Sequence, residues 1–196
     1  MPRRILVLFA HPMLERSRVN RRMVEGLGTL DGVTVNDLYE RYPTMVIDVE
    51  REKQLLVEHD VIVLQHPFYW YSAPAIVKEW LDLVLELGWA YGPGGTALRG
   101  KLMMNAITTG GANDAYHRDG YNRFTMRELL TPFDQTAHLC GMKYLAPFVI
   151  HGALRLGDGD DLRGHVAAYR TLLADLRDDR VDLDQAAAAA TQGGAA

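Results

Sequence analysis

The chain has 196 residues, of which 48% are hydrophobic, and a formal net charge of −4. This length suits a single α/β domain with a full core, and the negative charge leaves no basic field for binding nucleic acid. The lone Cys140 excludes an internal disulfide, which fits a reducing cytosol, and no Cys/His cluster has the spacing of a metal site. No apolar run approaches the length of a bilayer-spanning helix, so we expect a cytoplasmic protein without direct membrane insertion.

Short apolar runs alternate with helical patterns along the chain. Strands are predicted at residues 4–10, 33–39, 61–65, 102–108 and 143–150. Helices are predicted at residues 18–28, 48–59, 73–87, 122–140 and 160–178. Asp48 and Ser72 are expected to cap the helices that they precede, and Pro132 to disturb the helix around it. The alternation predicts an α/β fold in which a five-stranded, doubly wound parallel sheet lies between two layers of helices.

The C-terminal end of the chain differs in composition from the rest. From Asp182 onward it is rich in Ala, Gly and Gln and shows no periodicity. We therefore predict one domain over residues 1–181, followed by a disordered tail over residues 182–196.

Four consecutive aromatic residues, Phe68 to Tyr71, separate the strand at 61–65 from the helix at 73–87. In open α/β sheets, ligands bind at the carboxyl ends of the strands, and flat rings at this position suit a flat ligand. The alternative interpretation is an exposed apolar patch at a subunit interface. Both interpretations hold together if the site lies between two subunits.

The loop after the first strand, residues 11–17, leads into the start of a helix. Unpaired amides and the helix dipole at such a position favour an anion such as a phosphate, and Ser17 and Asn20 add side-chain donors. The alternative is that Ser17 acts only as an N-cap. Neither a G-x-G-x-x-G motif nor a P-loop is present, so a Rossmann dinucleotide site is not expected.

The loop after the fourth strand reads Thr108-Thr109-Gly110-Gly111 and offers backbone amides with no Cβ in the way. Its alternative interpretation is a plain turn. The three loops together offer a phosphate cradle, a wall for a ring and a row of amides at the edge of that ring. This set suits flavin mononucleotide better than a bare nucleotide. Because the loops contain no nucleophile paired with a base and no metal carboxylates, a cofactor would have to carry the chemistry.

An ordered set of motifs gives the chain a family resemblance that covers residues 5 to about 178. The chain resembles the flavodoxin-like NAD(P)H:quinone oxidoreductases of the DT-diaphorase type, and within them the bacterial ancillary subunits of glutathione-gated potassium-efflux systems. The motifs are Ala10-His11-Pro12 with Ser17 and Asn20, Leu38-Tyr39, Tyr42-Pro43, Ile47-Asp48, Gln65-His66-Pro67, Trp70-Tyr71-Ser72 with Pro74, residues 88–92, 95–98 and 100–101, Thr108 to Gly111, Cys140-Gly141 and Pro147-Phe148.

This resemblance implies a flavodoxin-like three-layer sandwich with strand order 2-1-3-4-5, and a homodimer. It also implies FMN as the cofactor, with FAD left open, and a ping-pong reaction. In that reaction NAD(P)H gives a hydride to flavin N5 and leaves, and a quinone then takes the hydride. An alternative role is that of a regulatory subunit on a potassium-efflux antiporter, held at the inner membrane by that partner. The flavin-contacting residues implied by motif match are His11, Ser17, Arg18, Val19, Asn20, Phe68, Tyr69, Trp70, Tyr71, Thr108, Thr109, Gly110 and Gly111.

One departure from the family concerns the quinone side of the site. Animal members carry a tyrosine shortly after T-T-G-G and a histidine six residues later, a pair thought to bind the quinone oxygens. Here Tyr116 matches the tyrosine, but Asn122 stands in place of the histidine, and an amide does not titrate near neutral pH. His117 is a candidate substitute close in sequence; the alternative is that Tyr116 and His117 are solvated loop residues without a role in the site. We also expect His66 to be a structural residue, whereas His151, after the last predicted strand, is only an alternative candidate for the rim of the site.

Overall fold

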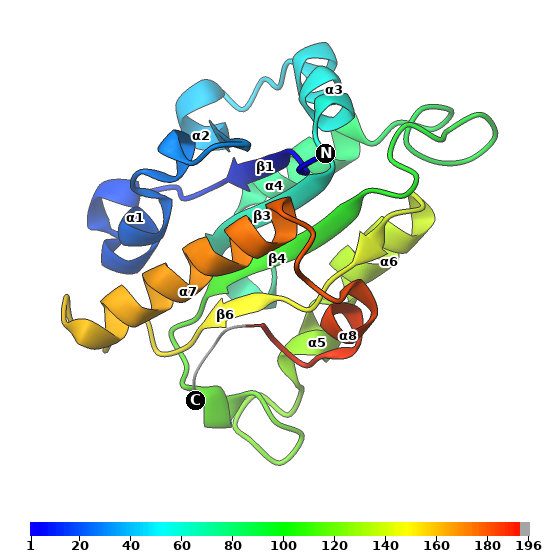
Figure 1. The fold of residues 1–196 in the computed structure, drawn as a ribbon. Coiled ribbons are helices and arrows are strands. Elements are labelled where there is room, and N and C mark those ends of the chain that lie inside the picture. The colour runs from blue at the N-terminus through cyan, green and yellow to red at the C-terminus, as the bar shows by residue number, and fades with distance from the viewer. Residues whose placement is uncertain (193–196) are drawn as a thin grey trace.

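The sheet of the computed structural model is parallel throughout (Figure 1). The structure describes residues 1–192. The order β2-β1-β3-β4-β5, with β6 also paired to β4, confirms the predicted doubly wound fold. The strands are β1 (Ile5–Phe9), β2 (Val33–Asp37), β3 (Val61–Pro67), β4 (Leu102–Thr108), β5 (Lys143–Tyr144) and β6 (Phe148–Ile150).

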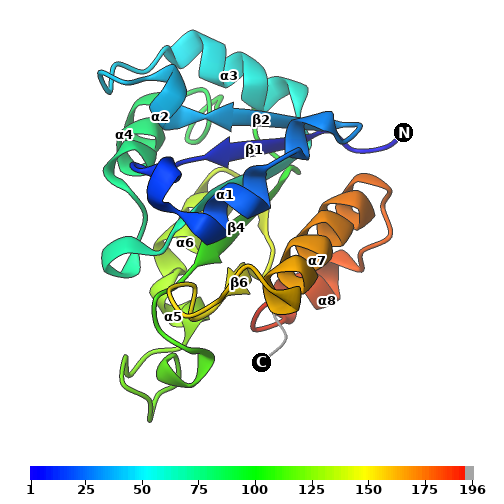
Figure 2. The same cartoon turned by 90° about the vertical axis from the view of Figure 1, so that its left-hand side faces the viewer.

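Helices cover both faces of this sheet (Figures 1 and 2). Leu6 and Leu8 of β1 face a core shared with α3, α4 and α6, whereas Ile5, Val7 and Phe9 face a core shared with α1 and α7. The period-2 alternation of a strand thus divides one apolar run between two cores, which is why the run is continuous in the sequence. The helices are α1 (Arg18–Val24), α2 (Leu38–Arg41), α3 (Val49–Glu58), α4 (Ala75–Val84), α5 (Met126–Leu129), α6 (Thr131–Leu139), α7 (Asp160–Arg177) and α8 (Leu183–Ala188), with single 3-10 turns η1 (Leu14–Arg16), η2 (Leu27–Thr29), η3 (Tyr69–Tyr71) and η4 (Asn113–Ala115).

The ends of several elements differ from the prediction because of side-chain caps and turn residues. The second strand ends at Asp37, whose carboxylate accepts hydrogen bonds from the amides of Tyr39 and Glu40 at 3.1 and 3.2 Å and so starts α2. The first helix ends at Val24, and Gly26 follows in the left-handed region. Asp48 caps α3 as predicted, accepting from the amide of Arg51 at 3.1 Å.

The predicted helix at 122–140 and the predicted strand at 143–150 are each divided in two. Thr125 and Glu128 form a capping box that starts α5, and Pro132 lies in the first turn of α6, where its missing N–H costs no helical hydrogen bond. Pro147 lies between β5 and β6. The amide of the preceding Ala146 donates to the carbonyl of Ala186 at 2.9 Å instead of continuing the sheet.

The prediction of a disordered tail from residue 182 is wrong for residues 182–192. Asp182 caps α8, accepting from the amides of Asp184 and Gln185, both at 3.0 Å. Ala186 is buried against the core shared with α7, and the amide of Gln192 donates to the carbonyl of Pro147 at 2.8 Å. The composition concealed a short capped helix that docks beside β6. Residues 193–196, which the prediction also covered, lie outside the described residues.

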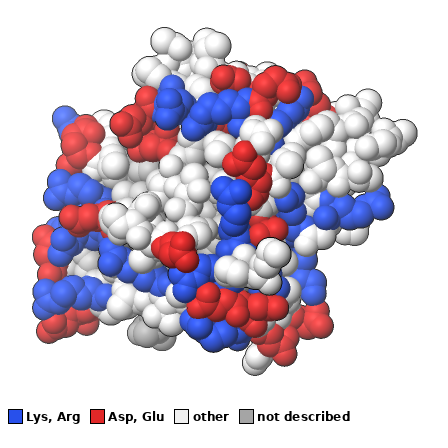
Figure 3. Space-filling view, turned by 45° about the horizontal axis from the view of Figure 1, so that its top comes forward, with Lys and Arg blue, Asp and Glu red and all other residues white. Residues whose placement is uncertain are grey.

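The surface of the described residues has two features that bear on function. Within residues 1–192, no helix combines the length and apolar character that crossing a bilayer requires. Cationic and anionic side chains are interspersed over the face in Figure 3, without a broad region of one sign. Residues 85–101, between α4 and β4, form a long loop that projects beyond the end of the sheet where β4 begins (green in Figure 1).

Candidate functional site

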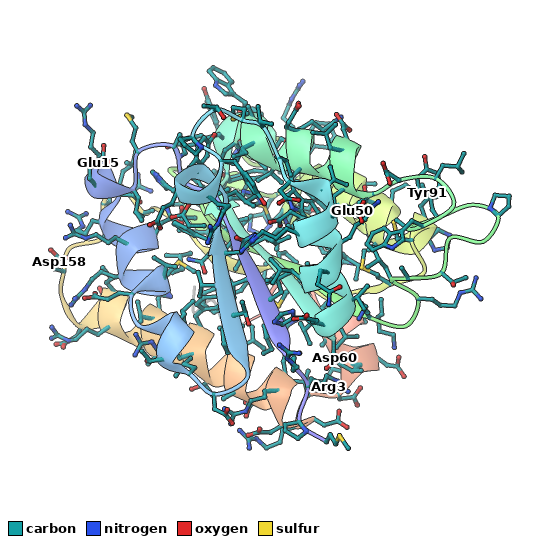
Figure 4. The ribbon with its side chains drawn as sticks, turned by 90° about the horizontal axis from the view of Figure 1, so that it is seen from above. Arg3, Glu15, Glu50, Asp60, Tyr91 and Asp158 are labelled. Atoms are coloured by element: carbon teal, nitrogen blue, oxygen red, sulfur yellow. The ribbon has the colours of Figure 1, made fainter. Side chains whose placement is uncertain are left out.

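A cavity of about 560 Å³ opens at the carboxyl ends of β1, β3 and β4. Glu15 after β1 and Asp158 before α7 lie at this edge of the molecule in Figure 4, and Arg3 and Asp60 lie at the opposite end of the strands. The lining includes most of the predicted cofactor residues, namely His11, Ser17, Arg18, Val19, Asn20, Phe68, Tyr69, Thr108, Thr109 and Gly110. It also includes residues that were not predicted to contact the cofactor, namely Met13, Arg16, Pro67, Ala153 and Leu154.

The start of α1 supplies backbone donors to this cavity. The first helical hydrogen bond runs from the amide of Arg21 to the carbonyl of Ser17 at 3.2 Å. The preceding amides, those of Arg18, Val19 and Asn20, therefore have no acceptor within the helix. The Ser17 hydroxyl does not cap the helix; it accepts from Asn20 Nδ2 at 3.1 Å. The donors for an anion are therefore these amides rather than a capping side chain.

Asn20 joins the first loop to the third. Its Nδ2 donates to Thr108 Oγ1 at 2.9 Å, and the residue is 3% exposed. Its Oδ1 is buried and has no hydrogen-bond partner among the described residues. An acceptor left unpaired in this way costs free energy, and a hydroxyl group of a ligand in the cavity would satisfy it.

The aromatic loop is anchored at one end and strained in its middle. The amide of Phe68 donates to the carbonyl of Thr108 at 2.9 Å, which fixes the loop to the end of β4. Trp70 and Tyr71 have φ angles of 50° and 60°, in the left-handed region that ordinary side chains avoid. Trp70 is 93% exposed, and both residues lie outside the cavity lining. A strained backbone that holds a large indole in solvent contributes nothing to the core and indicates a contact made with a ligand or partner.

Ser72 does not cap the helix after this loop, contrary to the prediction. Pro74 occupies the N-cap position of α4, without a side-chain cap, and the helix begins at Ala75. Trp80 of α4 is 2% exposed and belongs to the core.

The third loop offers fewer free amides than predicted. The amide of Thr109 donates to the carbonyl of Ile150 at 2.9 Å and is not available to a ligand. Within residues 1–192, the amides of Gly110 and Gly111 have no hydrogen-bond acceptor. A Cβ on Gly111 would lie 3.3 Å from the ring of Tyr116, so this glycine makes room for the tyrosine rather than for a ligand. Gly111 itself is outside the cavity lining.

The two residues predicted for the quinone side contact different partners. Tyr116 is 8% exposed, lies edge-on to Phe68 with 6.3 Å between ring centroids, and has its pKa raised by burial. Asn122 accepts from the hydroxyl of Tyr71 at 3.2 Å, which ties the loop after β4 to the aromatic loop. The histidine beside Tyr116 is His151, whose ring centroid lies 5.3 Å from that of Tyr116. A histidine directly after the last strand was the only sequence signal for this contact.

His66 is fully buried and takes part in a structural hydrogen-bond network. Its Nδ1 contacts the Pro67 carbonyl oxygen at 3.0 Å, and its Nε2 contacts Asn105 Nδ2 at 3.0 Å. Asn105 Oδ1 accepts from the Tyr144 hydroxyl at 2.6 Å. The ring therefore donates from Nδ1 and accepts at Nε2, which only the neutral form can do, and burial lowers the pKa of His66 from 6.5 to about 4.

This pKa predicts that the protein loses stability as the pH falls from about 6.5 to about 4. In that window the unfolded chain binds a proton at His66 and the folded chain does not, so acid favours unfolding, by about 3 kcal/mol at the lower end. Urea unfolding curves at several pH values measure this effect. Between these pH values, the free energy of unfolding of His66→Gln should change by about 3 kcal/mol less than that of the matched surface variant His138→Gln. An unchanged dependence in His66→Gln would contradict the assignment.

Comparisons with known proteins agree with the fold. A model of the flavodoxin-like fold family matches residues 3–173. The chain is 50% identical over 173 residues to the glutathione-regulated potassium-efflux system ancillary protein KefG of Pectobacterium carotovorum subsp. carotovorum, which covers 88% of this chain and 94% of that protein.

Two solved structures extend the comparison. The general stress protein 14 of Treponema denticola, solved in complex with FMN, superposes with a TM-score of 0.82 at 35% identity and covers 88% of this chain and 99% of that one. An NADPH-quinone reductase from P. pentosaceus superposes with a TM-score of 0.79 at 32% identity and covers 87% of this chain and 97% of that one. The chain therefore belongs to the flavodoxin-like fold family, whose fold it shares with NAD(P)H quinone reductases.

Proposed function

We propose that this protein is an FMN-dependent NAD(P)H:quinone oxidoreductase. The observation that carries the proposal is the cavity at the carboxyl ends of β1, β3 and β4, which brings three kinds of polar group together. The start of α1 suits a phosphate, the unpaired Oδ1 of Asn20 suits a polyol hydroxyl, and the free amide of Gly110 suits the polar edge of a ring. The residues present therefore fit FMN.

The loops around the cavity favour FMN over FAD. The guanidinium of Arg18 donates to the carbonyl of Leu156 and lies 4.0 Å from the carboxylate of Asp158, so the phosphate end is bridged to the loop before α7. FMN ends at its phosphate and would stop at this bridge. FAD continues past the phosphate into an adenosine and would have to extend beyond the bridge. The solved relative from Treponema denticola is described in complex with FMN, which supports the same choice.

Bound FMN would supply the hydride chemistry, and the protein would bind and orient the two flat reactants. The exposed rings of Trp70 and Tyr71, which directly follow Phe68 and Tyr69 of the cavity lining, would hold one side of a flat ring. NAD(P)H and a quinone would then occupy the open side in turn, as a ping-pong reaction requires. Hydride transfer needs contact between rings, so the positioning of the reactants is the main contribution of these residues.

We also propose a homodimer. Trp70 and Tyr121 are 93% and 90% exposed, which is unusual for large rings and is typical of contact surfaces. The loop 85–101 projects from the end of the sheet opposite the cavity, where it would be free to contact a partner (Figure 1). Tyr91 is labelled on this loop in Figure 4.

A second candidate function is that of an ancillary subunit of a potassium-efflux antiporter. The identity of 50% to a KefG protein, over 94% of its length, favours this role. Such a subunit would be cytoplasmic and would associate with the inner membrane through its partner. Both functions are compatible with one protein.

The test of the proposed enzyme is steady-state oxidation of NADPH and of NADH by the FMN-loaded protein with a benzoquinone as acceptor. We expect turnover that depends on FMN. Double-reciprocal plots recorded at several quinone concentrations should be parallel lines, as they are for a ping-pong reaction. Absence of turnover with both NADPH and NADH would contradict the proposed enzymatic activity. Potassium efflux from cells that express the antiporter, with and without this protein, tests the ancillary role separately.

A further inference from the structure

Leu154, in the loop after β6, is a large apolar side chain that the rest of the protein leaves almost uncovered. It is 84% exposed, yet it lines the cofactor cavity. A Cβ placed on Gly110 would lie 3.5 Å from Leu154 Cδ1, so the isobutyl group lies over this glycine at van der Waals distance. Because Gly110 supplies the free amide that suits the polar edge of a ring, Leu154 lies beside that edge.

Hydrogen bonds fix the segment that carries Leu154. The amide of Gly152 donates to the carbonyl of Gly111 at 2.8 Å, and the amide of Ala153 donates to the carbonyl of Thr109 at 2.8 Å. Gly152 has a φ of 64°, and its carbonyl accepts from the amide three residues later at 2.8 Å, which closes a turn around Leu154. The backbone therefore holds Leu154 in place, although its side chain is largely uncovered.

The sheet places Leu154 and the aromatic loop on opposite sides of Gly110. Thr108 of β4 is paired with Pro67 of β3 on one side and with Ile150 of β6 on the other. The loops that follow β3 and β6 therefore flank the loop that follows β4. A ring whose edge meets Gly110 would lie between them.

The same segment reaches the phosphate end of the cavity two residues later. The carbonyl of Leu156 accepts from the guanidinium of Arg18, the first residue of α1, where the free amides suit a phosphate. Leu154 thus lies near the ring end of the cavity and Leu156 near its phosphate end. One loop would therefore contact both ends of a ligand that consists of a ring and a phosphate.

We propose that Leu154 packs against the isoalloxazine ring of FMN beside Gly110. This inference rests on the proposed FMN-dependent function and adds a contact from a fourth loop to the three loops that the sequence indicated. Contact between the exposed leucine and a flat ring removes apolar surface of both from water, which stabilises the complex. Because the contact involves only the ring, its contribution does not depend on the phosphate.

Leu154→Ala should weaken FMN binding to the apoprotein by about 5- to 20-fold, because it removes apolar atoms that the ring would cover. Riboflavin has the same ring and no phosphate, so its affinity should fall by the same factor. Leu154→Met keeps a long apolar side chain and should keep both affinities within about threefold of the wild type.

The control is Leu139→Ala at the end of α6, where the leucine is 56% exposed and lies outside the cavity lining. This control should bind both ligands as the wild type does. An unchanged FMN affinity in Leu154→Ala, or a loss for FMN without a matching loss for riboflavin, would overturn the proposal.

Methyl NMR spectra give a second readout that requires no turnover. Addition of FMN should move the δ-methyl signals of Leu154, because these methyl groups would lie within the ring current of the isoalloxazine, and riboflavin should move them in the same direction. The δ-methyl signals of Leu139 should keep their positions. Leu154 signals that do not move in the FMN-saturated protein would overturn the contact.

The inference and the proposed function fail in different ways. A wild-type protein that binds no FMN would contradict the proposed cofactor, and the contact with it. Tight FMN binding that Leu154→Ala leaves unchanged would keep the cofactor assignment and overturn only the contact.

Discussion

Replacing Glu52 with alanine is expected to lower the free energy of unfolding by about 3–5 kcal/mol. Glu52 lies in the first turn of α3 and is completely buried. One carboxylate oxygen accepts from the Tyr42 hydroxyl at 2.6 Å and Arg51 Nη1 at 2.5 Å, and the other accepts from Trp80 Nε1 at 2.8 Å. Asn36 Nδ2 donates to both oxygens, at 3.0 and 2.8 Å.

This arrangement makes the carboxylate the acceptor for donors from β2, α3, α4 and the residue that follows α2. Its removal leaves the buried donors of Asn36, Tyr42 and Trp80 without this acceptor, and the desolvation that each has undergone is no longer offset. Tyr42 stays a donor over the accessible pH range, because burial and then Glu52 itself raise its pKa to about 12. Loss of the network should therefore loosen the segment that precedes α3 as well as the attachment of α4.

Urea unfolding measures the effect as a fall of about 2 M in the midpoint. Glu52→Gln serves as a second variant that keeps the shape of the side chain and should lose less stability than Glu52→Ala. The control is Glu50→Ala, two residues away on α3, where the side chain is 85% exposed and the loss should stay within about 0.5 kcal/mol. Equal midpoints for Glu52→Ala and Glu50→Ala would show that the buried network does not stabilise the fold.

Replacing Trp70 with glycine is expected to weaken FMN binding by about 10- to 100-fold while leaving the fold intact. Stacking of an aromatic side chain on a planar base is worth about 1–3 kcal/mol, and the exposed indole has no role in the core. Glycine also relieves the left-handed backbone at this position, where φ is 50°. Affinity and stability should thus respond differently to this substitution.

Fluorescence titration of FMN into the apoprotein measures the affinity, and thermal unfolding of the apoprotein measures the stability. Val57→Ala is the control, because Val57 is exposed on α3, away from the cavity. A variant that binds FMN as tightly as the wild type would remove Trp70 from the site. A variant whose apoprotein unfolds well below the wild type would show instead that the indole supports the fold.

The sequence predicted the features of this protein that depend on periodicity. The change of period at Ser72 predicted an aromatic loop at the end of a buried strand, and the alternation of strands with helices predicted a doubly wound parallel sheet, whereas the strand order came from the family resemblance. Both depend only on neighbours in the chain and on the few topologies that βαβ units allow. Most of the residues that line the cavity lie in loops that those two predictions bring to one edge, because parallel strands end there.

Contacts between distant segments could not be predicted in this way. Asn20 meets Thr108, and His151 meets Thr109, only because the sheet brings separate loops together. In the sequence, Glu52 lies in the first turn of a predicted helix, where an exposed carboxylate is favourable, but in the structure it is the centre of a buried network. No local pattern distinguishes a solvated carboxylate from one that three-dimensional packing has surrounded with donors.

The most direct test of the central claim is calorimetric titration of the apoprotein with FMN and, in parallel, with riboflavin. The proposed site predicts one FMN per chain, with riboflavin binding at least 10-fold more weakly because it lacks the phosphate that the start of α1 would hold. Failure of FMN to bind, or equal affinity for FMN and riboflavin, would contradict the assignment of this cavity.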